Sequence, residues 1–129
     1  MLGKLATHEF ATGGPAYDLP FPPARNPWNR AHFTGGSSSG SAVAVGAGDA
    51  DVAYGSDTGG SVRIPSALCG LAGFKPTARR VPITGVLPLS PTLDSIGPLA
   101  HSVACCALLY EVLAGEPVAP LRPAALSGL

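Results

Sequence analysis

Two segments rich in glycine and serine constrain this chain more than any other feature. Residues 35–41 read GGSSSGS and residues 57–61 read DTGGS, and we call them the first and second serine segments. Glycine adopts backbone conformations closed to other residues and lets a ligand approach the main chain. Consecutive glycines before a serine therefore favour backbone N–H groups turned toward a small anion or an oxyanion, with a hydroxyl beside them. A flexible linker is disfavoured, because both segments lead into stretches that are mostly apolar (43–45 and 62–65).

The composition indicates one domain with little charge. Of the 129 residues, 46% are apolar and 12% are charged, whereas about a quarter of an average globular protein is charged. Such a chain either buries much of its surface against something else or is a piece of a larger enzyme. The charges of eight basic and eight acidic residues cancel. The sequence has no basic stripe that would indicate direct binding to nucleic acid.

Cysteine usage and the N-terminal residues predict a cytoplasmic protein without a metal. Cys69, Cys105 and Cys106 lack the spacing of a zinc site and are interpreted as reduced, small apolar side chains. Polar residues follow Met1 closely, so we expect no signal peptide. No stretch approaches the roughly 18 apolar residues of a membrane span, so we expect no membrane partner.

Short apolar runs separated by glycine and proline predict an α/β fold with a mixed β-sheet covered by helices. Ser102 and Gly115 bound the clearest helix. The expected helices are 40–48, 65–69 and 102–114, the expected strands are 51–55, 71–75 and 96–99, and the proline-rich segments 14–28 and 78–98 are expected to be irregular. We expect a partial domain over 1–115 and a frayed tail over 116–129.

Ser61 is the best candidate nucleophile. A serine hydroxyl needs a base and donors for the oxyanion that it creates, and the N–H groups of Thr58, Gly59 and Gly60 are candidates for those donors. A phosphate-binding loop is excluded because neither GxxxxGK[ST] nor GxGxxG occurs. An α/β-hydrolase elbow at Ser61 is excluded, because residues 59–63 do not match GxSxG.

The other polar residues are interpreted as structural. His8, His32 and His101 are expected on the surface or in loops. Arg63 either binds a substrate carboxylate or, as we favour, ties its loop to Asp57. Asp94 is expected to be a turn residue.

Several motifs together resemble the amidase signature family. Ser61 follows Ser37 by 24 positions, and the second serine segment leads into SALCGLAGFKPT at 66–77. RNPW at 25–28 and TLDSIGPL at 92–99 also match. The family comprises serine hydrolases that cleave carbon–nitrogen amide bonds, and it includes the A subunit of aminoacyl-tRNA amidotransferases.

The resemblance implies a role for each residue that matches. It implies that Ser61 is the nucleophile and that Ser37 is a bridging serine, with a cis peptide bond at Ser37 or its neighbour Gly36. Thr58, Gly59 and Gly60, with the Ser61 amide, would form the oxyanion hole. It implies no cofactor and a small-molecule amide as substrate.

One catalytic group of the family has no counterpart here. The resemblance implies a lysine base in a segment before the first serine segment, but Lys4 and Lys75 match other family positions. We therefore expect a fragment that is inactive by itself. The alternatives are a component of a tRNA-dependent amidotransferase, with nucleic acid bound only through a partner, and a non-catalytic remnant. The full-length protein is a possible homodimer.

Overall fold

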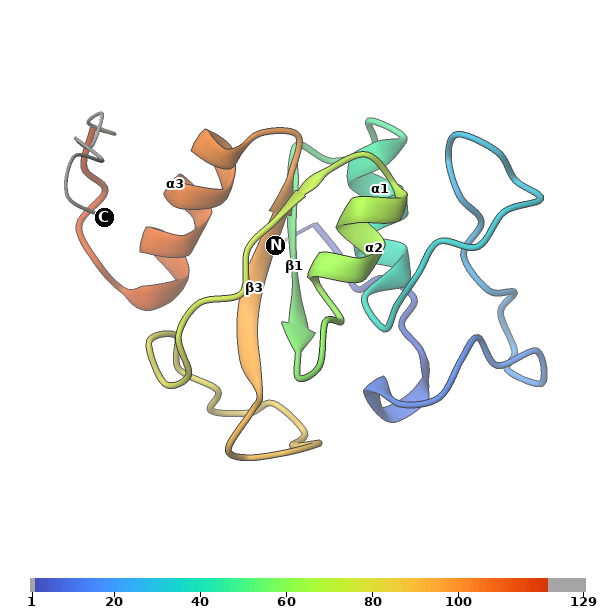
Figure 1. Ribbon diagram of the computed structural model, residues 1–129, viewed down its shortest axis with the longest axis horizontal. Helices are drawn as coiled ribbons and strands as arrows, with labels where there is room; N and C mark the ends of the chain where they lie inside the picture. Colours follow the sequence, from blue (N-terminus) through green and yellow to red (C-terminus); the bar gives the residue numbers. More distant parts are fainter. Residues whose placement is uncertain (1, 121–129) are drawn as a thin grey trace, which may run out of the picture.

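The computed structural model describes residues 2–120, which form three layers (Figure 1). The middle layer is a three-stranded sheet of β1 (Val52–Asp57), β3 (Ser95–Ala100) and β2 (Ala72–Gly73), with β3 in the centre. Helix α3 (Val103–Ala114) packs on one side, and α1 (Ser39–Gly46) and α2 (Arg63–Leu68) pack on the other. All six residues of β3 are buried because both faces of the sheet are covered.

The α/β fold is confirmed, and each predicted helix and strand is present with slightly different bounds. A single turn of 3₁₀ helix, η1 (Glu9–Ala11), lies in the N-terminal segment, for which the sequence shows no clear periodicity. The segment 71–75 forms a strand over only two residues, and the N–H of Phe74 adds one further hydrogen bond to the carbonyl of Pro98 in β3 at 3.1 Å. The residues beyond 120 lie outside the described part, so the expected frayed tail is described only over 116–120, which form neither helix nor strand.

The sheet differs from the mixed sheet that we expected. Strands β1 and β2 both pair with β3, and both pairings are antiparallel. Strands β1 and β2 run in the same direction, but β3 separates them, so residues 2–120 contain no parallel pair.

Helix α1 lies close to β1 because Gly55 has no side chain. A Cβ atom on Gly55 would stand 2.1 Å from the Ser38 hydroxyl oxygen. The hydroxyl of Ser41, one turn further along, donates to the carbonyl of Tyr54 at 3.1 Å. This close approach places the first serine segment directly against the strand that leads into the second.

Helix α3 has the ends that the sequence predicts. The Ser102 hydroxyl accepts a hydrogen bond from the N–H of Cys105 at 3.1 Å and caps the first turn. Gly115 ends the helix with a φ of 70°, a left-handed conformation that favours glycine. No helix of residues 2–120 is long and apolar enough to cross a membrane.

Polar contacts, more than aromatic packing, hold the proline-rich segment 14–28. The Asn26 side chain donates to the carbonyl of Leu68 at 2.9 Å, and the Trp28 indole donates to that of Cys69 at 2.8 Å. The rings of Trp28 and Tyr17 remain exposed. The segment therefore follows the surface and is tied to the end of α2.

Replacing Leu99 by alanine tests the core. Leu99 is fully buried in the cluster with Ala42, Val62 and Cys69, so Leu99→Ala should lower the free energy of unfolding by about 2–5 kcal/mol. Leu87→Ala is the matched control, because 69% of Leu87 is exposed, and it should change stability by less than about 0.5 kcal/mol. Urea denaturation followed by circular dichroism measures both. Equal losses would contradict this assignment of the core.

Candidate catalytic site

The two serine segments lie against each other at their serines. The N–H of Ser38 donates to the carbonyl of Ser61 at 3.1 Å. Ser37 is buried and Ser61 is partly exposed. Within residues 2–120, the hydroxyl groups of Ser37 and Ser61 make no hydrogen bond. The structure thus brings the segments together and leaves both hydroxyls without a protein partner.

The backbone of the first serine segment has the feature that the resemblance implies. The peptide bond between Gly36 and Ser37 is cis, which confirms that expectation.

The Asp57 carboxylate closes the second serine segment into a turn. Its Oδ2 atom accepts hydrogen bonds from the N–H groups of Val62 at 3.1 Å and Arg63 at 3.3 Å. The Asp57 side chain therefore links the residue before segment 58–61 to the two residues after it. Gly60 has a φ of 144°, which favours glycine, and its carbonyl accepts from the N–H of Ile64 at 2.7 Å.

The turn leaves a run of backbone donors without partners. In the part of the chain that the structure describes, no N–H group of residues 58–61 donates to a protein acceptor. Gly59 is exposed, and a Cβ atom added to it would meet nothing within 4 Å. Unpaired N–H groups beside a serine hydroxyl are suited to bind an anion or an oxyanion.

Asp57 and Arg63 form an ion pair with two contacts. The Arg63 Nε and Nη2 atoms lie 3.0 and 3.1 Å from the two Asp57 oxygens. Burial by itself would raise the pKa of Asp57, but the hydrogen bonds from Arg63 and from the Val62 N–H outweigh it, and that pKa is lowered. This confirms Asp57 as the brace of its loop. It also favours the pairing of Arg63 with Asp57 over a substrate carboxylate, although half of the Arg63 side chain is exposed.

Lys75 holds the second serine segment to the loop before β3. Its Nζ donates to the carbonyls of Asp57 and of Leu93, the latter at 2.7 Å, and lies 3.4 Å from the Ser95 hydroxyl. These contacts use all three of its donors. Lys75 therefore acts as a brace, a role that we did not predict, although the FKPT motif marked the residue.

Thr58 is fixed by its side chain. Its hydroxyl donates to an Asp94 carboxylate oxygen, and the other Asp94 oxygen accepts the N–H groups of Leu89 and Ser90, both at 2.9 Å. Asp94 is thus a turn residue, as predicted. The start of the second serine segment, at Asp57 and Thr58, is therefore joined to residues far along the chain.

His8 lies in a loop, which is one of the two predicted settings, but its imidazole is buried and not on the surface. Gly36 leaves room for the ring, which stacks on Phe33 with ring centres 6.0 Å apart. His32 and His101 are exposed, as predicted. No group of three His, Cys, Asp or Glu side chains within residues 2–120 is arranged to hold a metal.

Replacing Asp57 by asparagine tests the closure of the turn. Asp57→Asn keeps the shape but removes the charge that pairs with Arg63, so it should lower the free energy of unfolding by about 1.5–3 kcal/mol. Because the folded-state pKa of Asp57 is lowered, the difference between wild type and variant should be full at neutral pH and shrink below the ordinary value of 3.8.

Asp51→Asn is the control, because Asp51 is exposed and directly precedes the same strand. Denaturation curves at pH 7 and pH 3 measure both variants. A difference for Asp57→Asn that grows on acidification would contradict the ion-pair explanation.

We compared the chain with known protein families and proteins. The amidase family profile matches residues 1–120. The A subunit of a glutamyl-tRNA(Gln) amidotransferase from Roseiflexus castenholzii is 50% identical over 115 residues, which cover 89% of this chain and 24% of that protein.

Solved structures agree with the sequence match. The corresponding amidotransferase protein from Thermotoga maritima is 46% identical with a TM-score of 0.80, covering 86% of this chain and 25% of its own. The peptide amidase from Stenotrophomonas maltophilia is 37% identical with a TM-score of 0.77, covering 90% and 25%. This chain therefore spans about a quarter of the length of these relatives. With its motifs, its fold and these matches in agreement, it belongs to the amidase signature family.

Proposed function

We propose that this chain carries the acyl-transfer part of an amide hydrolase, with Ser61 as the nucleophile. The supporting observation is the run of unpaired N–H groups over residues 58–61, next to a serine hydroxyl that is partly exposed and makes no hydrogen bond. Backbone donors held in advance by a rigid turn stabilise the charge that develops on a substrate oxygen. Thr58, Gly59, Gly60 and the Ser61 amide are the proposed oxyanion hole.

The proposed reaction is an acyl transfer in two steps. The Ser61 oxygen attacks the amide carbon while its proton passes to the Ser37 oxygen, whose own proton passes to an amine base. The carbon–nitrogen bond then breaks, the leaving amine takes up a proton, and an ester to Ser61 remains. Water hydrolyses this ester and regenerates the hydroxyl. Ser37 is suited to the bridging role because it follows Gly36 in the segment that the Ser38 N–H holds to Ser61.

We propose that the 129 residues are inactive without an added base. All three N–H donors of Lys75 are used in its contacts to Asp57, Leu93 and Ser95. Lys4 is exposed in the N-terminal segment. A serine hydroxyl without a base is a weak nucleophile at neutral pH.

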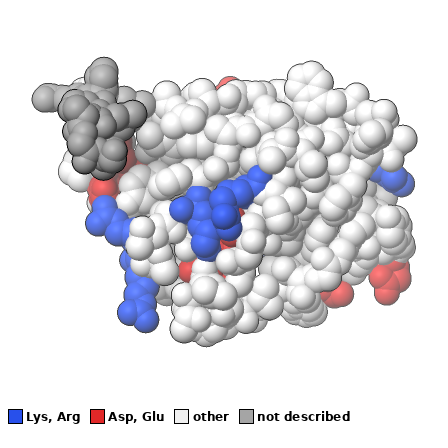
Figure 2. Space-filling model, in the orientation of Figure 1, with Lys and Arg blue, Asp and Glu red and all other residues white. Residues whose placement is uncertain are grey.

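A second candidate function is a role within a tRNA-dependent amidotransferase. It is favoured by the 50% identity to the A subunit of a glutamyl-tRNA(Gln) amidotransferase, whereas the peptide amidase is 37% identical. The formal net charge is zero, and Figure 2 shows scattered Lys and Arg rather than a continuous basic surface on the face drawn. Contact with tRNA would therefore fall to a partner protein.

Labelling with a fluorophosphonate in the presence of a small primary amine tests the proposal. Propylamine supplies the missing base, so it should raise the labelling rate of the wild-type chain by about 100-fold or more. The increase should disappear in Ser61→Ala and should fall strongly in Ser37→Ala. Ser90→Ala is the control, because only the backbone of Ser90 contributes hydrogen bonds.

The possible results separate the candidate functions of the chain. Amine-dependent labelling that persists in Ser61→Ala would contradict the assignment of the nucleophile. Rapid labelling of Ser61 without amine would show that the chain already holds a base. No labelling under either condition would favour a non-catalytic remnant.

A further inference from the structure

The N-terminal residues 6–8 run along the first serine segment as a strap. The N–H of His8 donates to the carbonyl of Ser37 at 3.0 Å, and the N–H of Gly40 donates to the carbonyl of Ala6 at 2.8 Å. A Cβ atom on Gly40 would stand 2.6 Å from the Ala6 nitrogen. The strap therefore contacts the first serine segment both at Ser37 and three residues beyond it.

The side chain at the end of the strap is a buried imidazole. His8 is 6% exposed, and its ring edge faces Gly36, where an added Cβ atom would lie 2.1 Å from the ring carbon between the two nitrogens. Its Nε2 atom is buried without a hydrogen-bond partner among residues 2–120. This is an unusual state, because most buried polar atoms are paired.

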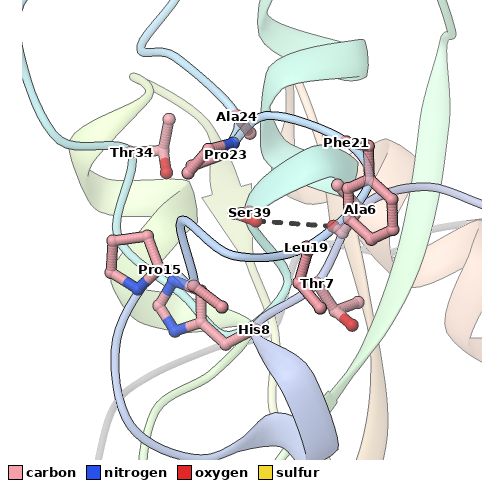
Figure 3. A pocket seen from close by; sticks show the side chains of 11 residues that line it. Ala6, Thr7, His8, Pro15, Leu19, Phe21, Pro23, Ala24, Thr34 and Ser39 are labelled. Atoms are coloured by element: carbon pink, nitrogen blue, oxygen red, sulfur yellow. Dashed lines mark hydrogen bonds between the residues drawn. The ribbon is translucent and has the colours of Figure 1, made fainter.

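The cavity beside the imidazole is lined largely by apolar residues, with the hydroxyl residues Thr7, Thr34 and Ser39 as its other members. His8 borders a cavity of about 10 Å³, about the volume that one water molecule needs. Figure 3 shows the lining, which includes Pro15, Leu19 and Phe21. Among residues 2–120, no Asp, Glu, Lys or Arg lines this cavity, and Glu9, the next residue in the chain, is exposed.

A proton on this ring would carry a charge into a site without a counter-ion. Burial lowers the pKa of His8, and a hydrogen-bonding contribution from the Gly13 backbone opposes it. The neutral ring fills the space beside Gly36, whereas a charged ring would draw water or move outward. Movement of His8 would disturb its N–H contact to Ser37.

We propose that His8 is a positioning residue for Ser37, and that its neutral imidazole holds the first serine segment against the second while its protonation loosens that contact. The link to catalysis rests on the proposed role of Ser37. The physical coupling between His8 and residues 37–39 is independent of that role.

The coupling has a defined pH dependence. Because the pKa of His8 is lowered in the folded state, its contribution to stability is complete above the ordinary value of 6.5 and is lost as the pH falls through the folded-state value. The hydrogen bonds from the Ser38 and Ser39 N–H groups, to Ser61 at 3.1 Å and to Ser37 at 2.9 Å, should weaken over the same range.

An NMR titration of the 129-residue chain between pH 8 and pH 4.5 tests the proposal. In wild type, the amide signals of Ser38 and Ser39 should shift with the same midpoint as the His8 imidazole, below 6.5. In His8→Gln, which does not titrate but retains a side-chain nitrogen, these amides should stay constant. His8→Asn is a second non-titrating variant. His101→Gln is the matched control, because His101 is exposed, and the Ser38 and Ser39 amides should titrate in it as in wild type.

The same variants give a functional readout in the presence of propylamine. The rate of Ser61 labelling should lose its His8-dependent acid limb in His8→Gln and keep it in His101→Gln. Amides that do not move as His8 titrates, or that move equally in His8→Gln, would overturn the proposal. Absence of labelling in every variant, with the amide titration intact, would overturn the proposed hydrolase function alone.

Discussion

The Asp57 carboxylate is the interaction on which the arrangement of the candidate site depends. The N–H groups of residues 58–61 lack protein acceptors, and a free chain would not hold four such groups in one fixed arrangement. Asp57 fixes the turn by accepting N–H groups from the residues that follow it and by pairing with Arg63. It does so from a fully buried position at the end of β1. A rigid strand therefore supplies the reference point for the whole second serine segment.

The first serine segment depends on a different device, which is the absence of side chains. Gly55 lets the Ser38 hydroxyl approach β1, Gly36 makes room for His8, and Gly40 lets the strap at Ala6 pass close by. A single methyl group at any of these glycines would prevent the close approach. The glycines therefore serve contacts between distant residues as much as local backbone geometry, and they allow two separate loops to meet at Ser38 and Ser61.

Much of the local structure could be predicted from residue types and order. Ser102 and Gly115 marked the ends of α3, and the segments around β1 and β3 were identified by short apolar runs. The serine segments pointed to anion-binding backbone because glycine repeats beside serine have few other uses in an apolar context. Asp57 could be assigned as a brace because it lies within hydrogen-bond reach of its own turn.

The long-range contacts could not be predicted in the same way. A two-residue strand such as β2 has no periodicity to detect, and the antiparallel sheet follows from β3 entering between two strands that precede it. Lys75 carries no local sign that it reaches both Asp57 and Leu93. His8 resembled a surface residue because the glycine that accommodates it lies 28 positions away, at Gly36. By itself, the sequence determined which residues turn, cap and carry chemistry, because those properties reside in single side chains and their neighbours. Only the tertiary structure decided which of them are buried, paired or left without a partner, because burial and pairing depend on segments that meet only after the chain has folded.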